Sequence, residues 1–327
     1  MREWYQLFLH EWQIKKAKGL SYPKAWLLPD CALEQLFYGV SPVEYFTYEF
    51  YRKGLKKRRA YAAGRKIWRL YDALNPDEYA HFLNNKADFC KKYTAYIHRD
   101  TLFSERADLE QFKAFIRKHP RFFAKPYHRS GGIGADIMEC GEDEAPELFE
   151  TLQKKHYQIE EIVKQCEELA AFNASSVNTL RFLTFVNAQG GVEILSLAGM
   201  RFGREGMIAD NVTSHHGIGC NVDARRGCVC TQGMDSEGNL YSIHPDSGLP
   251  IVNFAIPEWE KIRAALEEIA LVEPHLRLVG WDIAVNAARE VVFIEGNRRP
   301  DPIAFQCYGV GYWDVFKGLK TRHKEKK

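Results

Sequence analysis

The segment from Val279 to Pro300, VGWDIAVNAAREVVFIEGNRRP, constrains the fold of this chain more than any other stretch. Two short apolar runs, Leu278–Val285 and Val291–Ile294, are separated by the polar residues Asn286–Glu290. Apolar runs of this length joined by a polar turn are typical of a β-hairpin. The sequence therefore predicts two adjacent antiparallel strands here.

Three side chains with oxygen ligands accompany this hairpin. Asp282 lies in the first predicted strand, Glu295 ends the second, and Asn297 lies two residues further on. In an antiparallel hairpin this spacing can bring two carboxylates and an amide oxygen onto one face. Such hard oxygen ligands suit Mg²⁺, especially where phosphates complete its shell. A strand with an acidic edge, followed by a helix-capping Asn, accounts for the same residues without a metal.

The composition describes an ordered globular protein. With 327 residues, 46% of them hydrophobic, the chain can bury a large core and divide into two or three lobes. The net charge of +2 gives no reason to expect a nucleic-acid partner. The eight cysteines form no CxxC pair, and no signal peptide or apolar run of about 18 residues is visible. We therefore expect a cytoplasmic protein with reduced thiols.

Positive charge is concentrated at the start of the chain. Residues 1–75 carry fourteen Lys and Arg against seven Asp and Glu, a net charge of +7 that leaves −5 for the remainder. Much of this excess lies in Arg52–Arg69. A solvated helix face is the simpler interpretation. Peripheral contact with an anionic membrane surface, at the inner face of the membrane, or with a charged glycan is the alternative.

The predicted secondary structure changes near residue 120. Residues 1–105 read as mainly helical, with Ser41 as an N-cap before Pro42. Asp108–His119 has an acidic start, a basic end and apolar residues at helical spacing, so it is predicted as a helix. From Arg121 onward strands and helices alternate, with antiparallel hairpins. This order predicts an α+β (mixed α/β) fold.

A glycine-rich loop follows the predicted strand that begins at Arg121. Lys125 ends that strand, and Ser130 precedes Gly131, Gly132 and Gly134. Closely spaced glycines let the backbone approach a phosphate and point N–H groups at it, and the lysine adds a charge for the same anion. The motif is not a P-loop, because GK[ST] is missing and a strand follows. A plain hairpin turn is the alternative.

The predicted strand Tyr157–Lys164 offers a second binding feature. It contains Glu161-Ile162-Val163-Lys164, whose backbone donors and acceptors suit the edge of an adenine ring, and Glu168 lies seven residues beyond Glu161. An exposed edge strand protected by charged side chains is the alternative.

Taken in order, KP-x3-S-x-GIG, EEIVKQ and D-x12-E-x-N resemble the ATP-grasp superfamily. The D-alanine–D-alanine ligases share the seven-residue step and the Asp, Glu, Asn spacing. The chain more closely resembles the ATP-grasp family found beside sugar-transfer genes in polysaccharide clusters. The phrases SPVEYFTYEF, LNNKADFCKKY, SSVNTLRFLTF, HPDSGLPI and IEGNRRPD carry that resemblance from about Ser41 to Pro302.

The resemblance implies two α+β lobes that hold ATP between their sheets. After the helical region 1–105, residues 106–170 would form the small lobe and residues 171–327 the large lobe. The resemblance implies that one set of residues binds the phosphates, adenine and ribose of ATP. These residues are Lys86, Lys125, Ser130, Gly131, Gly132, Gly134, Glu161, Ile162, Lys164, Glu168 and Asn178. The resemblance also assigns Mg²⁺ to Asp282, Glu295 and Asn297.

One position departs from the D-alanine ligases, which carry an arginine two residues before the metal-binding Asp. Gly280 stands there in this chain. Transition-state stabilisation would then fall to Arg181, Arg201 or Arg298, with Arg201 as the first choice.

The resemblance implies an ATP-dependent carboxylate–amine ligase acting through an acyl phosphate. Its substrates would be a small-molecule or sugar-linked carboxylate and an amine, used in surface polysaccharide biosynthesis. Asn211, His215 and His216 are candidate substrate residues, although a structural turn explains them equally well. A zinc site there has no evident third ligand. A small-molecule kinase and a non-enzymatic, membrane-associated assembly partner are the alternative functions.

Overall fold

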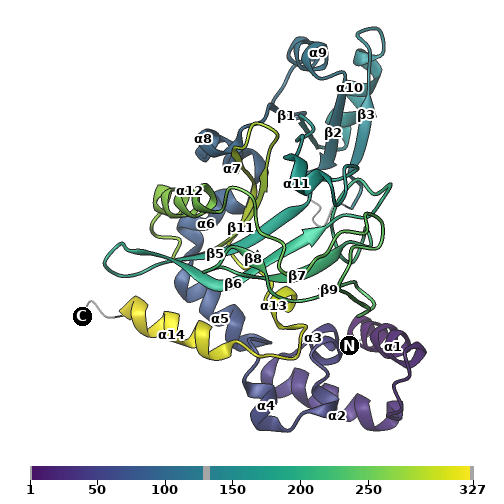
Figure 1. Cartoon of the computed structure of the whole chain (residues 1–327), viewed down its shortest axis with the longest axis vertical. Helices are drawn as coiled ribbons and strands as arrows, with labels where there is room; N and C mark the ends of the chain where they lie inside the picture. Colours follow the sequence, from purple (N-terminus) through teal and green to yellow (C-terminus); the bar gives the residue numbers. More distant parts are fainter. Residues whose placement is uncertain (1, 128–132, 325–327) are drawn as a thin grey trace.

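The computed structural model describes residues 2–127 and 133–324 as helices packed around two antiparallel sheets. Figure 1 shows the smaller sheet at the top, the larger sheet in the middle and the first helices at the base. The predicted α+β class is confirmed. The strands of the smaller sheet, in spatial order, are β1 (Thr101–Phe103), β4 (Tyr157–Glu160), β2 (Arg121–Pro126) and β3 (Asp136–Glu139).

Two helices cover one face of the smaller sheet. These are α9 (Leu109–Lys118) and α10 (Ala145–Lys154), whose buried aromatic residues form one core with Phe122 and Ile159 of the strands. Helix α9 begins as predicted, because the side chain of Asp108 accepts a hydrogen bond from the backbone N–H of Gln111 and the side chain of Gln111 accepts one from the backbone N–H of Asp108. Strand β4 ends at Glu160, earlier than the predicted Lys164.

The larger sheet has eight strands within the described residues, and β12 is one of its edges. Its spatial order is β10, β9, β7, β6, β5, β11, β12, with β8 paired to β7. The bounds are β5 (Thr179–Val186), β6 (Val192–Phe202), β7 (Ile218–Asp223), β8 (Cys228–Val229), β9 (Gly233–Met234), β10 (Leu240–Tyr241), β11 (Leu278–Val285) and β12 (Val291–Asn297).

Each face of the larger sheet packs on a separate set of helices. On one face, Phe182 and Trp281 lie in a core shared with α12 (Trp259–Val272), α6 (Asp77–Asn84), α7 (Lys86–Lys92), α8 (Thr94–Ile97) and α11 (Glu167–Ala170). On the other face, Leu183 and Leu278 pack on α5 (Arg65–Leu74), α13 (Ile303–Gln306) and α14 (Trp313–Lys324). The alternation of side chains along each strand therefore serves two cores.

The N-terminal helices α1 (Arg2–Ala17), α2 (Lys24–Tyr38), α3 (Pro42–Thr47) and α4 (Leu55–Arg59), with the 3₁₀ turn η1 (Phe50–Arg52), form a separate aromatic core. Helix α3 is capped by Ser41 as predicted. The expectation that the charges of Arg52–Arg69 all lie on a solvated face is wrong for Arg58. Its side chain is buried and pairs with Asp30 and Glu34.

The predicted boundary at residue 105 does not match the packing. Strand β1 already belongs to the smaller sheet, and α5–α8 pack on the larger one. The predicted N-terminal region is therefore divided, because only α1–α4 have a core of their own. None of the helices in residues 2–127 and 133–324 is long and apolar enough to cross a membrane.

Candidate functional site

The hairpin β11–β12 brings the predicted oxygen ligands onto one face. Asp282 lies directly opposite Glu295, and Gly280 lies directly opposite Asn297. The amide of Asn297 also donates to Glu295 Oε1 at 3.2 Å. The expected convergence of these three side chains on one face is therefore present in the structure.

A β-bulge in β12 produces this alignment. The pairing shifts between Asp282 and Ile283, which lies opposite Phe293, so that Ile294 is the extra residue. Without the shift, Ile294 would lie opposite Asp282 and Glu295 would turn toward the core that holds Phe293. The bulge therefore moves one carboxylate from the core face to the polar face.

The buried side chain of Arg99 holds the bulge. Its Nη1 donates to the carbonyl of Phe293 at 2.8 Å, and its Nη2 donates to the carbonyl of Ile294 at 3.3 Å. The same guanidinium pairs with Glu160 Oε1 at 2.8 Å. Because Glu160 lies at the end of β4, Arg99 ties the edge of the larger sheet to the smaller sheet.

Glu160 is surrounded by donors. Lys125 Nζ lies 2.7 Å from Glu160 Oε2, and Gln158 Nε2 donates to Glu160 Oε1 at 2.7 Å. Burial alone would raise the pKa of Glu160, but the positive charges of Arg99 and Lys125 outweigh burial and lower the pKa to about 2. As an ionised carboxylate, Glu160 therefore fixes the direction of the Lys125 side chain.

A small hollow of about 80 Å³ lies where the two sheets meet. Lys86, Lys125, Gln158, Glu295 and Asn297 are among the residues that line it. Burial and the neighbouring charge of Lys125 lower the pKa of Lys86. Two ammonium groups around one hollow favour an anion there. A whole nucleotide needs several hundred Å³ and would extend beyond the hollow.

Next to this hollow, Asp282 is locked between two arginines. Arg181 makes two hydrogen bonds to it, one to each carboxylate oxygen, and Arg201 Nη2 donates to Asp282 Oδ2 at 3.1 Å. Arg181 also lies 4.0 Å from Glu295 Oε1. Burial opposes ionisation of Asp282, but the two arginines keep its pKa below the ordinary value. The predicted metal ligand is thus engaged in ion pairs on both oxygens.

Arg201 continues the polar row across the sheet. Its Nε and Nη2 donate to Thr179 Oγ1 at 3.0 and 2.7 Å, and its Nε lies 3.5 Å from Asp210 Oδ1. Asp210 in turn accepts from the backbone of Thr179 at 2.8 Å. Lysines, carboxylates and arginines therefore form one continuous track from the edge strand β12 to β6.

The third predicted arginine does not belong to this track. Arg298 pairs with Asp77 and donates to the carbonyl of Asn75 at 3.2 Å, so it faces the start of α6. The departure at Gly280 also has a steric reason. A Cβ at that position would lie 2.6 Å from the Cβ of Pro300, which leaves no room for an arginine.

Glu161, which is predicted to hold adenine, lies beside the start of β1. Successive side chains of an extended segment point to opposite sides, and Glu160 is the one that faces Lys125. Glu161 Oε2 instead accepts from the backbone of Asp100 at 3.1 Å, beside His119. Glu160 is therefore the glutamate that contacts Lys125, and the assignment of adenine to Glu161 stays a prediction.

Two further predicted nucleotide contacts have structural partners. Glu168 pairs with Arg289, in the β11–β12 turn, at 2.7 Å. Asn178 is fully buried, its amide donates to the carbonyls of Leu169 and Asn173, and its oxygen accepts from Gly203. The expectation that Asn178 faces the cleft is wrong, because its hydrogen bonds are satisfied inside the protein.

The remaining nucleotide residues are placed only in part. Ile162 and Lys164 lie in an extended segment after β4, and the carbonyl of Lys164 accepts from Ala287 at 2.7 Å. Gly134 has a φ of 77°, which suits glycine. The predictions for Ser130, Gly131 and Gly132 fall outside the described residues.

The predicted substrate residues follow Asp210, at the far end of the polar track. The side-chain oxygen of Asn211 accepts from the backbone of Thr213 and Ser214 at 3.0 and 2.9 Å. His215 Nδ1 lies 2.8 Å from Ser214 Oγ, and His216 has a φ of 55°. Asn211 therefore shapes the turn, whereas the roles of the two histidines stay predictions.

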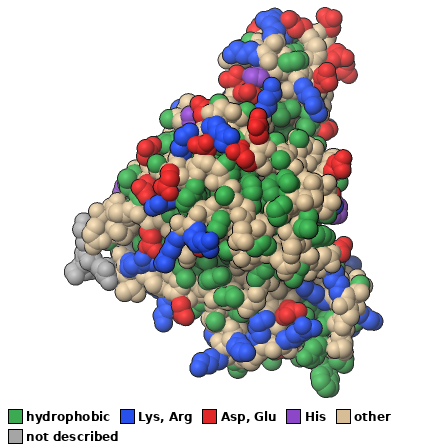
Figure 2. All heavy atoms as spheres, in the orientation of Figure 1, with side chains coloured by type: hydrophobic (Ala, Val, Ile, Leu, Met, Phe, Trp, Pro, Cys, Tyr) green, Lys and Arg blue, Asp and Glu red, His purple; other side chains and the backbone are tan. Residues whose placement is uncertain are grey.

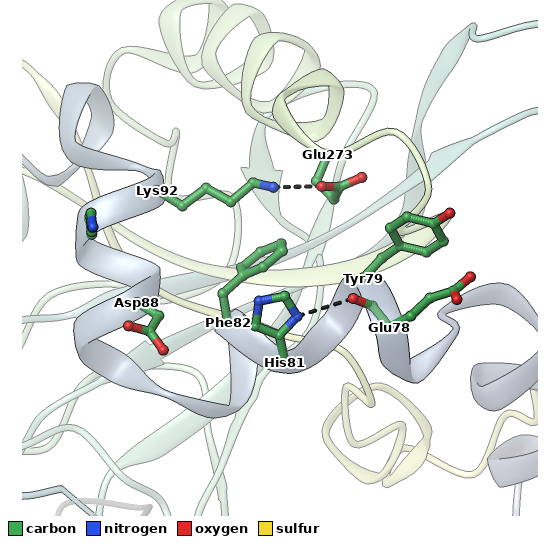
Figure 3. Close-up of a pocket in the computed structure, with 8 residues that line it drawn as sticks. Glu78, Tyr79, His81, Phe82, Asp88, Lys92 and Glu273 are labelled. Carbon is green, nitrogen blue, oxygen red and sulfur yellow. Dashed lines mark hydrogen bonds and ion pairs between the residues drawn. The ribbon is translucent and has the colours of Figure 1, made fainter.

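A larger hollow of about 390 Å³ lies elsewhere, between α6, α7 and the end of α12. Figure 3 shows that Lys92 and Glu273 pair across it and that His81 reaches the carbonyl of Glu78. No residue of the predicted site lines it. We do not take it as the candidate site, because neither the lysines Lys86 and Lys125 nor the arginines Arg181 and Arg201 line it.

Sequence reasoning missed Arg99, Glu160 and Thr179. The pair of adjacent glutamates at the end of β4 gave a signal, but the periodicity alone did not say which one faces inward. Arg99 stands in no motif, since its role depends on carbonyls from a bulge almost 200 positions later in the chain. Only the folded structure brings these groups together.

The residues present fit a nucleotide with its magnesium ion. Gln158 Oε1 is buried without a hydrogen-bond partner in the described part of the chain, and Gln158 lines the hollow. Such an acceptor suits a donor on a bound molecule. Glu295, whose side chain is 41% exposed, and Asn297 offer the hard oxygens that Mg²⁺ prefers. The two lysines supply charge for phosphate.

Comparison with known proteins identifies one matching family. The profile of the sugar-transfer associated ATP-grasp family matches residues 66–317. No curated protein matches by sequence. Similar solved structures include the VanG D-Ala:D-Ser ligase from Enterococcus faecalis, at 10% identity over 75% of this chain and 63% of that one, with a TM-score of 0.46. Another is the D-alanyl-alanine synthetase A from Vibrio cholerae, at 14% identity over 75% of this chain and 66% of that one, with a TM-score of 0.47.

Replacing Asp282 should destabilise the fold. Asp282→Asn removes the buried carboxylate charge that Arg181 and Arg201 share, and loss of one partner from a buried ion pair costs about 3–5 kcal/mol. The free energy of unfolding in urea measures this change. The matched control is Asp72→Asn, which breaks the exposed pair with Arg299 and should cost less than about 1 kcal/mol. Equal effects of the two variants would contradict the assignment.

Glu160 should make stability depend on acid pH. Because its folded-state pKa is depressed to about 2 from 4.5, its contribution is fully present above pH 4.5 and is lost as the pH falls toward 2. Glu160→Gln should therefore be less stable than the native protein at neutral pH, and the difference should shrink below pH 4.5. Urea unfolding at a series of pH values measures this. A difference that stays constant down to acid-induced unfolding would refute the role of the charge.

Proposed function

Because the chain belongs to the sugar-transfer associated ATP-grasp family, we propose that it is an ATP-dependent carboxylate–amine ligase. The observation that carries this proposal is the continuous polar track that begins where the two sheets meet and runs across the larger sheet. Lys86 and Lys125 line its first part with Glu295, and Arg181 and Arg201 form its second part around Asp282. Cationic groups for phosphate, oxygen ligands for a metal ion and guanidinium groups thus lie along one track, and phosphoryl transfer to a carboxylate uses all three.

Each of the charged side chains along the track would have a separate role in binding ATP and its metal ion. Lys86 and Lys125 would bind phosphates of ATP, and Glu160 would hold Lys125 in place through the 2.7 Å pair. Glu295 and Asn297 would hold Mg²⁺, which when bound neutralises charge on the phosphates. Asp282 would act first as the partner that orients the two arginines, since both its oxygens are already paired.

The reaction needs no nucleophile from the protein. A substrate carboxylate would attack the γ-phosphorus of ATP, giving an acyl phosphate and ADP. An amine would then attack the acyl carbon and release phosphate. Arg181 and Arg201 are held in fixed positions, so they would stabilise the charge on the transferring phosphoryl group without reorganising. The buried surroundings of Asp282 would keep water from the acyl phosphate.

The substrates are proposed from the family and from the far end of the track. The sugar-transfer association of the family supports a sugar-linked or small-molecule carboxylate, joined to an amino acid or amine during surface polysaccharide biosynthesis in the cytoplasm. The loop that contains His215 and His216 follows Asp210, which lies beside Arg201. These histidines would meet the amine or the carboxylate. His215 is already hydrogen-bonded to Ser214, so its position is set.

Glu295→Gln tests the metal assignment. Glu295 is partly exposed and meets Arg181 only at 4.0 Å, so the variant should keep its stability within about 0.5 kcal/mol. Loss of one ligand charge should nevertheless raise the Mg²⁺ concentration needed for ADP formation at least about tenfold. A magnesium titration of ADP release measures this.

The matched control is Glu290→Gln in the turn of the same hairpin. Glu290 is exposed and hydrogen-bonds Asn286, away from Asp282. Its magnesium requirement should equal that of the native protein. If Glu295→Gln and Glu290→Gln behave alike, Glu295 does not bind the metal.

Amine-dependent ADP release separates a ligase from a kinase. We expect a screen of carboxylate and amine pairs to give ADP and an amide only when both substrates are present, with the amide identified by mass spectrometry. A stable phosphorylated product formed without amine would identify a kinase instead. Absence of nucleotide binding by calorimetry would favour a non-enzymatic assembly partner.

A further inference from the structure

The exposed face of α2 is more apolar than its buried face. Trp26, Leu33, Leu36 and Phe37 are 73%, 52%, 66% and 63% exposed. Their spacing places them along one side of the helix, three or four residues or whole turns apart. An isolated exposed leucine is ordinary, but a contiguous stripe of large apolar side chains on one helix indicates a contact surface.

The buried side of the same helix carries its acidic residues. Glu34 is 2% exposed and pairs with Arg58 and Arg59, and Asp30 also pairs with Arg58. Leu27 and Cys31 complete this inner face. A helix that only needed to pack on its own protein would have the opposite arrangement. The fold therefore turns the negative charges of α2 inward and leaves its apolar side chains outside.

Positive charge surrounds the apolar stripe. Between Lys24 and Arg65 every acidic residue is buried or half-buried, and the half-buried Asp30 and Glu49 pair with arginines. Arg52, Lys56, Lys57 and Arg65 are exposed. Arg65 touches the stripe directly, because its Nη2 donates to the carbonyl of Leu36 at 2.6 Å. Leu55, at the start of α4, adds another apolar side chain that is 63% exposed. Figure 2 shows Lys and Arg side chains gathered with apolar ones at the base of the molecule, where α2 and α4 lie in Figure 1.

We propose that this basic–apolar surface, defined as the outer side of α2 with α4, docks on an anionic lipid bilayer. Trp26, Leu36 and Phe37 enter the boundary between headgroups and acyl chains, while Lys56 and Lys57 contact lipid phosphates. Charge selects this occupant over a second copy of the chain, because two copies of a surface bordered by four exposed cations, whose acidic residues are buried or are half-buried and paired, would repel each other.

Docking by this surface agrees with the position of the candidate site. Figure 1 shows α2 and α4 at the base and the smaller sheet at the opposite end. The separate core of α1–α4 gives the docking helices rigid support. The hollow where the two sheets meet therefore stays away from the lipid, and the proposal stands independently of the reaction proposed above.

Vesicle flotation with the full chain tests the proposal. Vesicles of phosphatidylcholine alone should retain little protein, whereas vesicles that also contain phosphatidylglycerol should carry it, and raised salt should release it. Two variants divide the surface into its components. W26S/F37S removes apolar area and K56E/K57E reverses charge, and each should lower the partition coefficient on anionic vesicles at least about tenfold.

Matched control variants lie elsewhere on the chain. L240S changes an exposed leucine of β10, and K154E/K155E reverses two adjacent exposed lysines near the end of α10. Both controls should float like the native protein, and circular dichroism should show that all variants are folded. Controls that lose binding as strongly as the α2 and α4 variants would overturn the proposal.

Two other outcomes would also overturn it. The first is failure of the native protein to float with anionic vesicles. The second is self-association of the native protein without lipid, measured by sedimentation velocity, that W26S/F37S abolishes, since the stripe would then be an interface between copies of the chain.

Discussion

The two sheets are joined by the guanidinium group of Arg99, which is almost completely buried. It satisfies two carbonyls exposed by the bulge in β12 and at the same time neutralises Glu160 at the end of β4. A buried arginine requires both kinds of partner, because an unpaired guanidinium inside a protein is costly. The edge of the larger sheet and the end of the smaller sheet are therefore positioned by one side chain. Lys125 then takes its direction from the remaining oxygen of Glu160.

The bulge has a second consequence, on the opposite side of β12. By adding Ile294 to the strand it reverses the alternation of side chains, so that Phe293 stays in the core and Glu295 joins Asp282 on the polar face. The polar face then alternates in sign from Glu295 to Arg181, Asp282, Arg201 and Asp210. Each charge has an opposite neighbour, which explains how so many ionised groups are kept in a partly buried row. Electrostatics and strand geometry thus depend on the same irregularity.

Local pattern predicted the strands well, because apolar runs and capping residues are short-range signals. The strand Leu278–Val285 and the capped helix after Asp108 both form as expected. The errors concern side-chain direction and long-range partners. The motif alone does not show that Glu160 contacts Lys125, because a one-residue change in alternation cannot be read from a motif. Arg298 and Arg181 were both predicted to stabilise the transition state, but in the structure Arg298 pairs with Asp77. The steric reason for Gly280, which is the close contact that a side chain there would make with Pro300, exists only in the folded structure.

The charge row also decides which carboxylate is available to a metal ion. Asp282 has two guanidinium groups on its oxygens, so a cation would have to displace an arginine and overcome the repulsion of the other. Glu295 has only a 4.0 Å contact with Arg181, a 3.2 Å hydrogen bond from Asn297, and access to the hollow that Lys86 and Lys125 line. Coulomb's law therefore favours Glu295 as the first ligand. Asp282 would become a ligand only if phosphate drew Arg181 or Arg201 off its oxygens, which would couple metal coordination to the arrival of the anion.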